Sequence, residues 1–280
     1  MKKYIKRLLQ SFVSRFVSDQ NSERIIRFLA HVKNVDIIHI AHQSIGIMKY
    51  LTPEESGEAY IINTVIAKYF DYRNGRRPVI FDIGANVGNY TCQLAHIHPN
   101  IDIFSFEPNP STYTKLSANI AAFKNAQGFN LGLGSEKGFL NMYTYADDLE
   151  SEHASVYRDV LSELHSSNAL VEKQVVIETI YDFCKGNRIE KIDFLKIDTE
   201  GFEYEVLKGA KDMLVNNRIP LIQFEFNEMN VVSRVFLKDF YEILSDYDLF
   251  RIDSNRLIPL GGYNSRNEIF QFQNILAIYR

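Results

Sequence analysis

The sequence predicts an α/β protein whose core is a doubly wound, mostly parallel sheet, preceded by a helical region. From residue 77 onward, short β-branched or aromatic runs alternate with helical patterns of apolar residues. This alternation is typical of a parallel sheet with helices on both faces. The 280 residues are 46% hydrophobic and 24% charged, which are the proportions of a globular protein long enough to bury a large core.

The expected elements follow the alternation along the chain. The expected strand and helix pairs are 79–83 with 90–95, 101–106 with 112–123, 192–197 with 202–214, and 221–226 with 235–244. Further expected strands are a third region at 128–134, then 138–144, 174–180 and a terminal strand at 273–279. Right-handed crossovers are expected between the parallel strands.

Residues 1–75 are expected to form a helical region separate from a domain at 76–280. In residues 1–17, apolar pairs recur every four residues beside basic residues, which predicts a helix with one apolar stripe and a basic flank. Such a helix could lie on an anionic membrane face or a partner, or pack on its own domain. A second helix is expected to start at Thr52, with Pro53 at its first position and Glu55 as the capping-box partner.

Charge and cysteine content exclude several classes of protein. Residues 1–50 carry a net charge of +6, whereas the remaining residues carry −10, so a broad nucleic-acid footprint is not expected. The two cysteines, Cys92 and Cys184, are too few for a disulfide framework and lack zinc-ligand spacing. No apolar run is long enough to span a bilayer. We therefore expect a cytoplasmic protein, with peripheral contact at the inner membrane face as an option for the N-terminal helix.

The first motif with chemical content lies at the end of the run 79–83. It reads D-x-G-x-x-x-G, from Asp82 through Gly84, Ala85 and Asn86 to Gly88, and differs from the dinucleotide fingerprint G-x-G-x-x-G. Ligands of open α/β sheets bind at this edge, and glycine permits both a tight turn and close approach. A carboxylate at Asp82 that faced the ligand would suit an ammonium better than a pyrophosphate. This favours S-adenosylmethionine as the cofactor.

A second acid follows the next strand. Glu107 comes 23 residues after Gly84 and is placed to accept hydrogen bonds from both ribose hydroxyls. The third strand region at 128–134 should flank the adenine, and we select Asn130 there as a cofactor-binding candidate.

The third motif follows the run 192–197. Asp198 and Glu200 are expected at the same sheet edge, beside the methionine part of the cofactor, and are our catalytic candidates. Alternatively, Asp198 and Thr199 only cap the next helix. Oxygen ligands at Asp198, Glu225 and Asn227 would permit a divalent metal, which we do not favour.

Three segments, VIFDIGANVGNYT, FEPNP and FLKIDTEGFEYEVLKGA, together resemble those of FkbM-type S-adenosylmethionine-dependent methyltransferases over roughly residues 78 to 250. The resemblance implies a class I methyltransferase (Rossmann-like) fold and O-methylation of a hydroxyl on a sugar, a glycan or a secondary metabolite. It also assigns roles to matching residues: cofactor binding to Asp82, Gly84, Asn86, Gly88 and Glu107, and the third motif to Asp198, Glu200 and Gly201.

An alcohol is a weak nucleophile, so a positioned base should accelerate methyl transfer. Asp198 or Glu200 is the first candidate, followed by His153 or His165 if the long acidic segment between 144 and 174 closes over the acceptor. Two other classes remain open: a catalytically silent methyltransferase fold that acts as a binding module, and an NAD(P)-dependent oxidoreductase. The sequence does not identify the acceptor or the oligomeric state.

Overall fold

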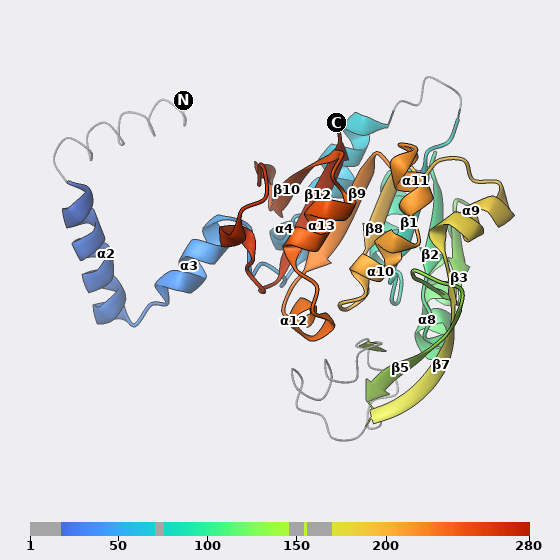
Figure 1. The fold of residues 1–280 in the computed structure, drawn as a ribbon, viewed down its shortest axis with the longest axis horizontal. Coiled ribbons are helices and arrows are strands. Elements are labelled where there is room, and N and C mark those ends of the chain that lie inside the picture. Colours follow the sequence, from blue (N-terminus) through green and yellow to red (C-terminus); the bar gives the residue numbers. More distant parts are fainter. Residues whose placement is uncertain (1–17, 71–75, 146–153, 156–169) are drawn as a thin grey trace. The chain divides into compact units, whose positions relative to one another are not determined.

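The computed structural model describes residues 18–70, 76–145, 154–155 and 170–280 (Figure 1). The chain divides into two compact units, residues 1–44 and 45–280. In the first unit, α2 (Asp19–Lys33) begins after Ser18, whose hydroxyl accepts a hydrogen bond from the N–H of Asn21. The second helix of that unit is α3 (Ile37–Ser44), and neither helix contains a buried residue. Among the described residues, no helix is long and apolar enough to cross a membrane.

The second unit is built on a sheet that has eight strands among the described residues. In spatial order they are β11 (Arg256–Pro259), β10 (Tyr247–Asp253), β12 (Gln273–Tyr279), β9 (Leu221–Phe226), β8 (Phe194–Ile197), β1 (Val79–Ile83), β2 (Asp102–Phe106) and β3 (Ala126–Phe129). The five strands from β9 to β3 are parallel, and β12, β10 and β11 are each antiparallel to the preceding neighbour. The mostly parallel α/β architecture is therefore as predicted.

The order of the strands places a topological switch point beside β1. The chain runs outward from β1 to β2 and β3, and it later returns to the other side of β1 as β8. Crevices that bind ligands in open α/β sheets form where the strand order reverses, at the carboxyl ends of the strands. The first and third sequence motifs therefore meet at this edge.

Helices cover both faces of the sheet. One face packs against α9 (Ile180–Asn187), α10 (Glu203–Lys208), α11 (Lys211–Val215) and α13 (Leu237–Ile243). This layer includes an aromatic group in which the rings of Phe106 and Phe183 are 4.8 Å apart between centroids and nearly perpendicular. The other face packs against α7 (Asn89–Ile97) and the π-helical segment η1 (Ile61–Ile66). The sheet domain also contains two further helices, α8 (Pro110–Ile120) and α12 (Met229–Ser233), and the 3₁₀ turn η4 (Ser265–Asn267).

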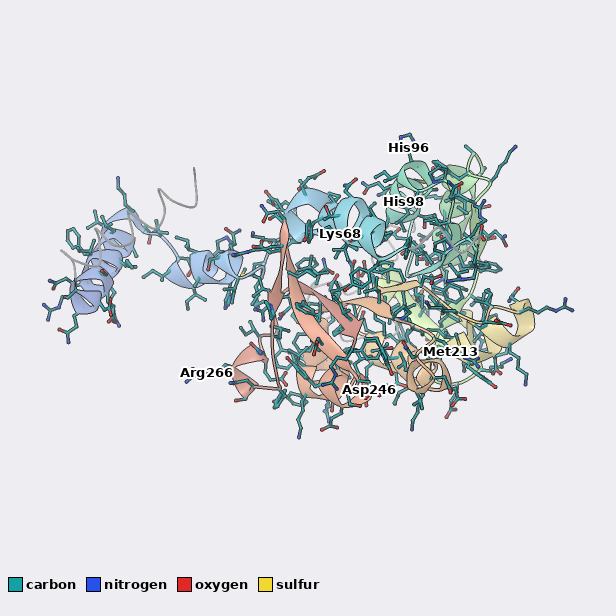
Figure 2. All side chains as sticks on the ribbon, turned by 90° about the horizontal axis from the view of Figure 1, so that it is seen from above. Lys68, His96, His98, Met213, Asp246 and Arg266 are labelled. Atoms are coloured by element: carbon teal, nitrogen blue, oxygen red, sulfur yellow. The ribbon has the colours of Figure 1, made fainter. Side chains whose placement is uncertain are left out.

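The segment 45–70 packs on the sheet domain. It contains α4 (Pro53–Ser56), α5 (Glu58–Tyr60), η1 and α6 (Ala67–Tyr69). As predicted, α4 starts at Thr52, whose Oγ1 accepts a hydrogen bond from the N–H of Glu55. Ile61 and Ile62 are fully buried. The ring of His98, at the end of α7, is 2.8 Å from the carbonyl oxygen of Ile62 (Figure 2). The compact units therefore divide at 44/45, whereas the composition suggested a division at 75/76.

A smaller sheet lies between β3 and β8 in the sequence. Its four strands among the described residues, in spatial order, are β4 (Gly132–Leu133), β7 (Leu170–Glu178), β5 (Gly138–Tyr145) and β6 (Ala154–Ser155). β5 and β7 pair antiparallel along their whole length. Most of the acidic segment between residues 144 and 174, with His153 and His165, lies outside the described residues.

Several elements differ from the sequence prediction. The helix expected at 202–214 is interrupted at Gly209, where a Cβ would lie 2.0 Å from the carbonyl oxygen of Gly134. The strand expected at 174–180 ends at Glu178, because Thr179 caps α9. The antiparallel strands β10 and β11 were not predicted.

Candidate functional site

A cleft opens at the carboxyl edge of β1, β2 and β8, beside the switch point. Five of its polar residues, Asn86, Glu107, Asp198, Thr199 and Glu200, come from the loops after these strands, and Thr112 comes from α8. Its apolar walls include Ile83, Phe106 and Leu133 from the two sheets. The space between the walls is about 810 Å³, counting the part that is open to solvent.

The turn after β1 brings the first motif against the end of β8. The N–H groups of Gly84 and Ala85 both donate to the carbonyl oxygen of Phe106 at 3.0 Å, which ties the turn to β2. Gly84 has φ +75°, and a Cβ there would lie 1.7 Å from the carbonyl oxygen of Asp198. Only glycine allows this approach. Gly88 has φ +90° and precedes the first residue of α7.

Glu107 joins the turn after β1 to the loop after β2. Its Oε2 accepts a hydrogen bond from the N–H of Asn86 at 3.1 Å, and its Oε1 accepts one from the N–H of Asn109 at 2.8 Å. Burial raises the pKa of this carboxyl to about 7, although the two N–H groups act in the opposite direction. Glu107 lines the cleft, as its predicted role requires, and each carboxylate oxygen has a further lone pair for a ligand hydroxyl.

Asn130 is not one of the residues that line the cleft. Its Nδ2 donates to the carbonyl oxygens of Glu107 at 2.9 Å and Pro108 at 3.0 Å. The side chain thus holds the loop after β2 from outside. In the third strand region, Gly132 and Leu133 line the cleft instead.

Asp82 is fully buried and does not line the cleft, whereas we expected its carboxylate to face the ligand. Its Oδ2 accepts a hydrogen bond from the hydroxyl of Thr91 at 2.6 Å, and its Oδ1 lies 3.6 Å from Nζ of Lys196. The reason is the alternation of side chains along β1. Phe81 and Ile83 belong to the core layer under α9–α13, while Ile80 belongs to the opposite layer, on the same side of the strand as Asp82.

Asp198 and Glu200 lie in the turn after β8 and both line the cleft. Glu200 and Gly201 are in the left-handed region, with φ +56° and +98°. Neither Asp198 nor Thr199 caps α10, because its N-cap is Phe202 and no side chain caps it. The capping alternative therefore does not apply to this turn.

Glu203 holds this turn, and the sequence analysis gave it no role. Its Oε1 accepts hydrogen bonds from the N–H and hydroxyl of Thr199, at 2.8 and 3.1 Å, and from the N–H of Gly201 at 3.1 Å. Burial raises the pKa of Glu203 to about 7, against the effect of these N–H groups, and the carboxylate of Asp198 raises it further. In sequence, an acid in the first turn of a helix is so common that it gave no distinctive signal.

Glu225 lies near the end of β9 and Asn227 directly follows the strand, and Nδ2 of Asn227 donates to Oε1 of Glu225. Burial raises the pKa of Glu225 well above its ordinary value, and the carboxylates of Asp198, Glu200 and Glu203 raise it further. Within the described part of the chain, no group of three or more His, Cys, Asp or Glu side chains could hold a metal ion. A metal on Asp198, Glu225 and Asn227 stays an alternative that we do not favour.

The cleft thus combines a glycine turn after β1, an acid after β2 and a second acidic turn after β8. Comparison with known protein families shows which family has this combination of motifs. The sequence profile of the methyltransferase FkbM domain matches residues 82–248, which includes all three segments.

The chain belongs to the FkbM methyltransferase family.

Several curated proteins are similar in sequence to part of this chain. Methyltransferase sdnD of Sordaria araneosa is 30% identical over 159 residues, which are 48% of this chain and 61% of that protein. The 2-O-methyltransferase NoeI of Sinorhizobium fredii is 23% identical over 61% of this chain and 73% of its own. The hexuronic acid methyltransferase AglP of Haloferax volcanii is 25% identical over 61% of this chain and 63% of its own. The chain thus spans about three fifths of the length of two of these three FkbM-type relatives.

Among solved structures, the precorrin-6y C5,15-methyltransferase of Geobacter metallireducens aligns with 78% of this chain and 87% of its own. The sequence identity is 13% and the TM-score is 0.38.

Proposed function

We propose that this FkbM-family protein is an S-adenosylmethionine-dependent O-methyltransferase. The observation that supports the proposal most strongly is the cleft at the switch point, where three family motifs contribute to one set of walls. Glu107 comes from the second motif, and Asp198 and Glu200 come from the third. The first motif contributes Gly84 and Asn86.

The cleft has the chemistry that S-adenosylmethionine requires. Carboxylates suit the positive charge of its sulfonium and ammonium groups, and Glu107 retains lone pairs for ribose hydroxyls. Ile83, Phe106 and Leu133 offer apolar surface suited to an adenine ring. When bound, this cofactor supplies a methyl group on a positively charged sulfur, which an oxygen nucleophile can attack in line.

The residues of the chain position the reactants and accept the proton. Glu203 fixes the turn that carries Asp198 and Glu200 through Thr199 and Gly201, so the backbone of the turn is held without help from a ligand. Holding an acceptor oxygen in line near the methyl group supplies several kcal/mol, about 7–11 in well-oriented cases. Asp198 or Glu200 is the proposed base for the acceptor hydroxyl, a role that contributes about 10²–10⁴-fold.

The proposed acceptor is a hydroxyl on a sugar, a glycan or a secondary metabolite. Two relatives support this class by name, since one is a 2-O-methyltransferase and another is a hexuronic acid methyltransferase. Met142, Val175 and Ile177 of the small sheet form a wall of the cleft and are candidates to contact the acceptor.

We further propose that the N-terminal region contacts an anionic membrane surface, as a peripheral contact separate from the sheet domain. Two observations support this. Residues 1–50 carry a net charge of +6. Large apolar side chains on α2, among them Phe28, Leu29 and Val32, are more than half exposed. Deletion of residues 1–44 should release the protein from vesicles that contain acidic lipids, and equal binding after deletion would contradict the proposal.

Isothermal titration calorimetry with S-adenosylhomocysteine and with NADH tests the proposed activity. We expect tight binding of S-adenosylhomocysteine and none of NADH, and the reverse result would favour an oxidoreductase. Incubation with radiolabelled methyl donor and lysate fractions then shows whether label enters polysaccharide, lipid, protein or small molecules. Binding of S-adenosylhomocysteine without transfer to any fraction would favour a silent binding module.

A further inference from the structure

A buried chain of polar groups runs behind the cleft. Its side chains come from β2, α7, β1 and β8. The hydroxyls of Ser105 and Thr91 are 2.7 Å apart, and the Thr91 hydroxyl donates to Asp82 at 2.6 Å. Nζ of Lys196 lies 3.6 Å from the other oxygen of Asp82 and donates to Oδ2 of Asp198 at 3.0 Å.

Lys196 is the central member of this chain. It is only 4% exposed, and its ammonium lies 5.0 Å from the centroid of the Tyr90 ring. Burial by itself lowers the pKa of Lys196, but Asp198, Asp82 and Glu58 outweigh burial and raise that pKa well above its ordinary value. These carboxylates therefore favour the charged form of the ammonium.

The two carboxylates that face Lys196 differ in their surroundings. Asp82 is fully buried and anchored through Thr91 to α7, so it forms the fixed end of the chain. The Asp198 side chain is 36% exposed and lies at the cleft. Its contact with Lys196 is the shorter of the two.

Other carboxylates surround Asp198. Glu58 from α5 and Glu225 from β9 both interact electrostatically with it, and like charges repel. Glu200 and Glu203 are further acids of the same turn. In the part of the chain that the structure describes, the hydrogen bond from the Lys196 ammonium is what holds the Asp198 carboxylate against these neighbours.

We propose that Lys196 is a positioning residue that holds the carboxylate of Asp198 at the cleft, with Asp82 as the anchor that fixes the ammonium. This inference rests on the proposed function, because it concerns how Asp198 is presented to a cationic cofactor. Lys196 itself does not line the cleft and touches no reacting atom.

The affinities for S-adenosylmethionine and S-adenosylhomocysteine provide a readout that needs no acceptor. The two ligands differ by the methyl group and the positive charge on sulfur, so the ratio of their affinities reports how a nearby carboxylate is placed. Calorimetry should be done on the full chain for wild type, Asp198→Asn, Lys196→Met and the double variant Lys196→Met/Asp198→Asn.

The three possible roles of Lys196 predict different changes in the preference for S-adenosylmethionine over S-adenosylhomocysteine. If Lys196 positions Asp198, Lys196→Met lowers the preference for S-adenosylmethionine by about threefold to fivefold, as Asp198→Asn does. The double variant is then no worse than Asp198→Asn alone. If the ammonium acts only by repelling the positive sulfur of the cofactor, its removal raises the preference for S-adenosylmethionine. If Lys196 only supports the fold, both affinities fall together and the effects of the two substitutions add. Either of the last two results would overturn the proposal.

Lys196→Met leaves Asp82 buried without its ammonium, and this variant could fail to fold. The double variant Asp82→Asn/Lys196→Met removes both buried charges and still deprives Asp198 of its partner. Its preference for S-adenosylmethionine should therefore be lower than that of Asp82→Asn, by the same factor by which Lys196→Met is lower than wild type. Lys208→Met is the matched control, because it removes an exposed ion pair of 2.6 Å with Glu205 on α10 and should leave the ratio unchanged.

Crystal structures of the ligand-free variants separate this inference from the proposed function. In Asp82→Asn/Lys196→Met, the Asp198 carboxylate should leave the position that it has in wild type, while the Glu203-bound turn stays. An Asp198 side chain in its original place would overturn the positioning role, whatever the ligand affinities are. If the wild type binds neither ligand, the proposed cofactor is wrong, and the crystal structures still decide the role of Lys196.

Discussion

Replacement of Glu203 by glutamine should make the protein more stable at high pH, and the magnitude follows from the pKa of that carboxyl. Burial raises the pKa of Glu203 from 4.5 to about 7. A raised carboxyl pKa means that folding disfavours the ionised form. Its stability contribution is therefore complete below pH 4.5, falls as the pH rises toward 7, and is constant above that.

The size of the effect follows from the two pKa values. The free energy of unfolding of wild type loses about 1 kcal/mol to this ionisation at pH 5 and about 3 kcal/mol at pH 7 and above. Glutamine does not ionise, and its carbonyl oxygen can still accept the three hydrogen bonds that Oε1 accepts. The advantage of Glu203→Gln over wild type should thus grow by about 2–3 kcal/mol between pH 5 and pH 8.5.

Urea denaturation of both proteins at pH 5, 7 and 8.5 measures this difference, in which the contributions of other titrating groups largely cancel. Asn216→Ala is a suitable control, since it removes one exposed hydrogen bond of 2.6 Å and should shift stability equally at every pH. A difference between Glu203→Gln and wild type that does not change with pH would refute the reasoning. So would a larger advantage at pH 5 than at pH 8.5.

Three further predictions concern the cleft. Gly84→Ala should lower the free energy of unfolding in urea by more than about 3 kcal/mol, because its Cβ would lie 1.7 Å from the Asp198 carbonyl oxygen at φ +75°; a loss below 1 kcal/mol would show that the turn can move. Glu107→Ala should weaken S-adenosylhomocysteine binding by at least about tenfold in calorimetry, and an unchanged dissociation constant would remove Glu107 from the ribose site. Once an acceptor is known, Asp198→Asn should lower turnover by about 100-fold or more but change the affinity for S-adenosylmethionine by less than about tenfold; if turnover survives, Glu200 becomes the leading base.

The parallel part of the fold could be predicted because its signals are local. β1 and β9 have the bounds that their apolar runs suggested, and Thr52 caps α4 as expected. The antiparallel strand β10 was missed for a physical reason. It contains Arg251 and Asp253, which are 3% and 6% exposed, and the exposed Asp248, and three charged residues in seven hide the apolar pattern of a buried strand.

The location of the candidate site could be predicted from the sequence, but only some of the contacts within it could. The spacing of Gly84, Glu107 and Asp198 placed all three at one edge, and all three line the cleft. The direction of Asp82 could not be predicted, because β1 is buried on both faces and its sequence does not show which side faces the ligand. The roles of Glu203 and Lys196 depend on contacts with residues from other elements or around a turn, and residue type alone does not reveal such contacts.

The small sheet enters and leaves the main fold at nearly the same point, since the N–H of Gly134 donates to the carbonyl oxygen of Glu178 at 2.9 Å. Closing an insertion whose ends already touch adds little entropic cost as its length changes. The stretch from 135 to 177 can therefore be lengthened, shortened or exchanged between relatives without disturbing the strands on either side. Because Met142 and Val175 belong to this stretch, such an exchange would alter the wall of the cleft that we propose contacts the acceptor and would leave Gly84 and Glu107 in place.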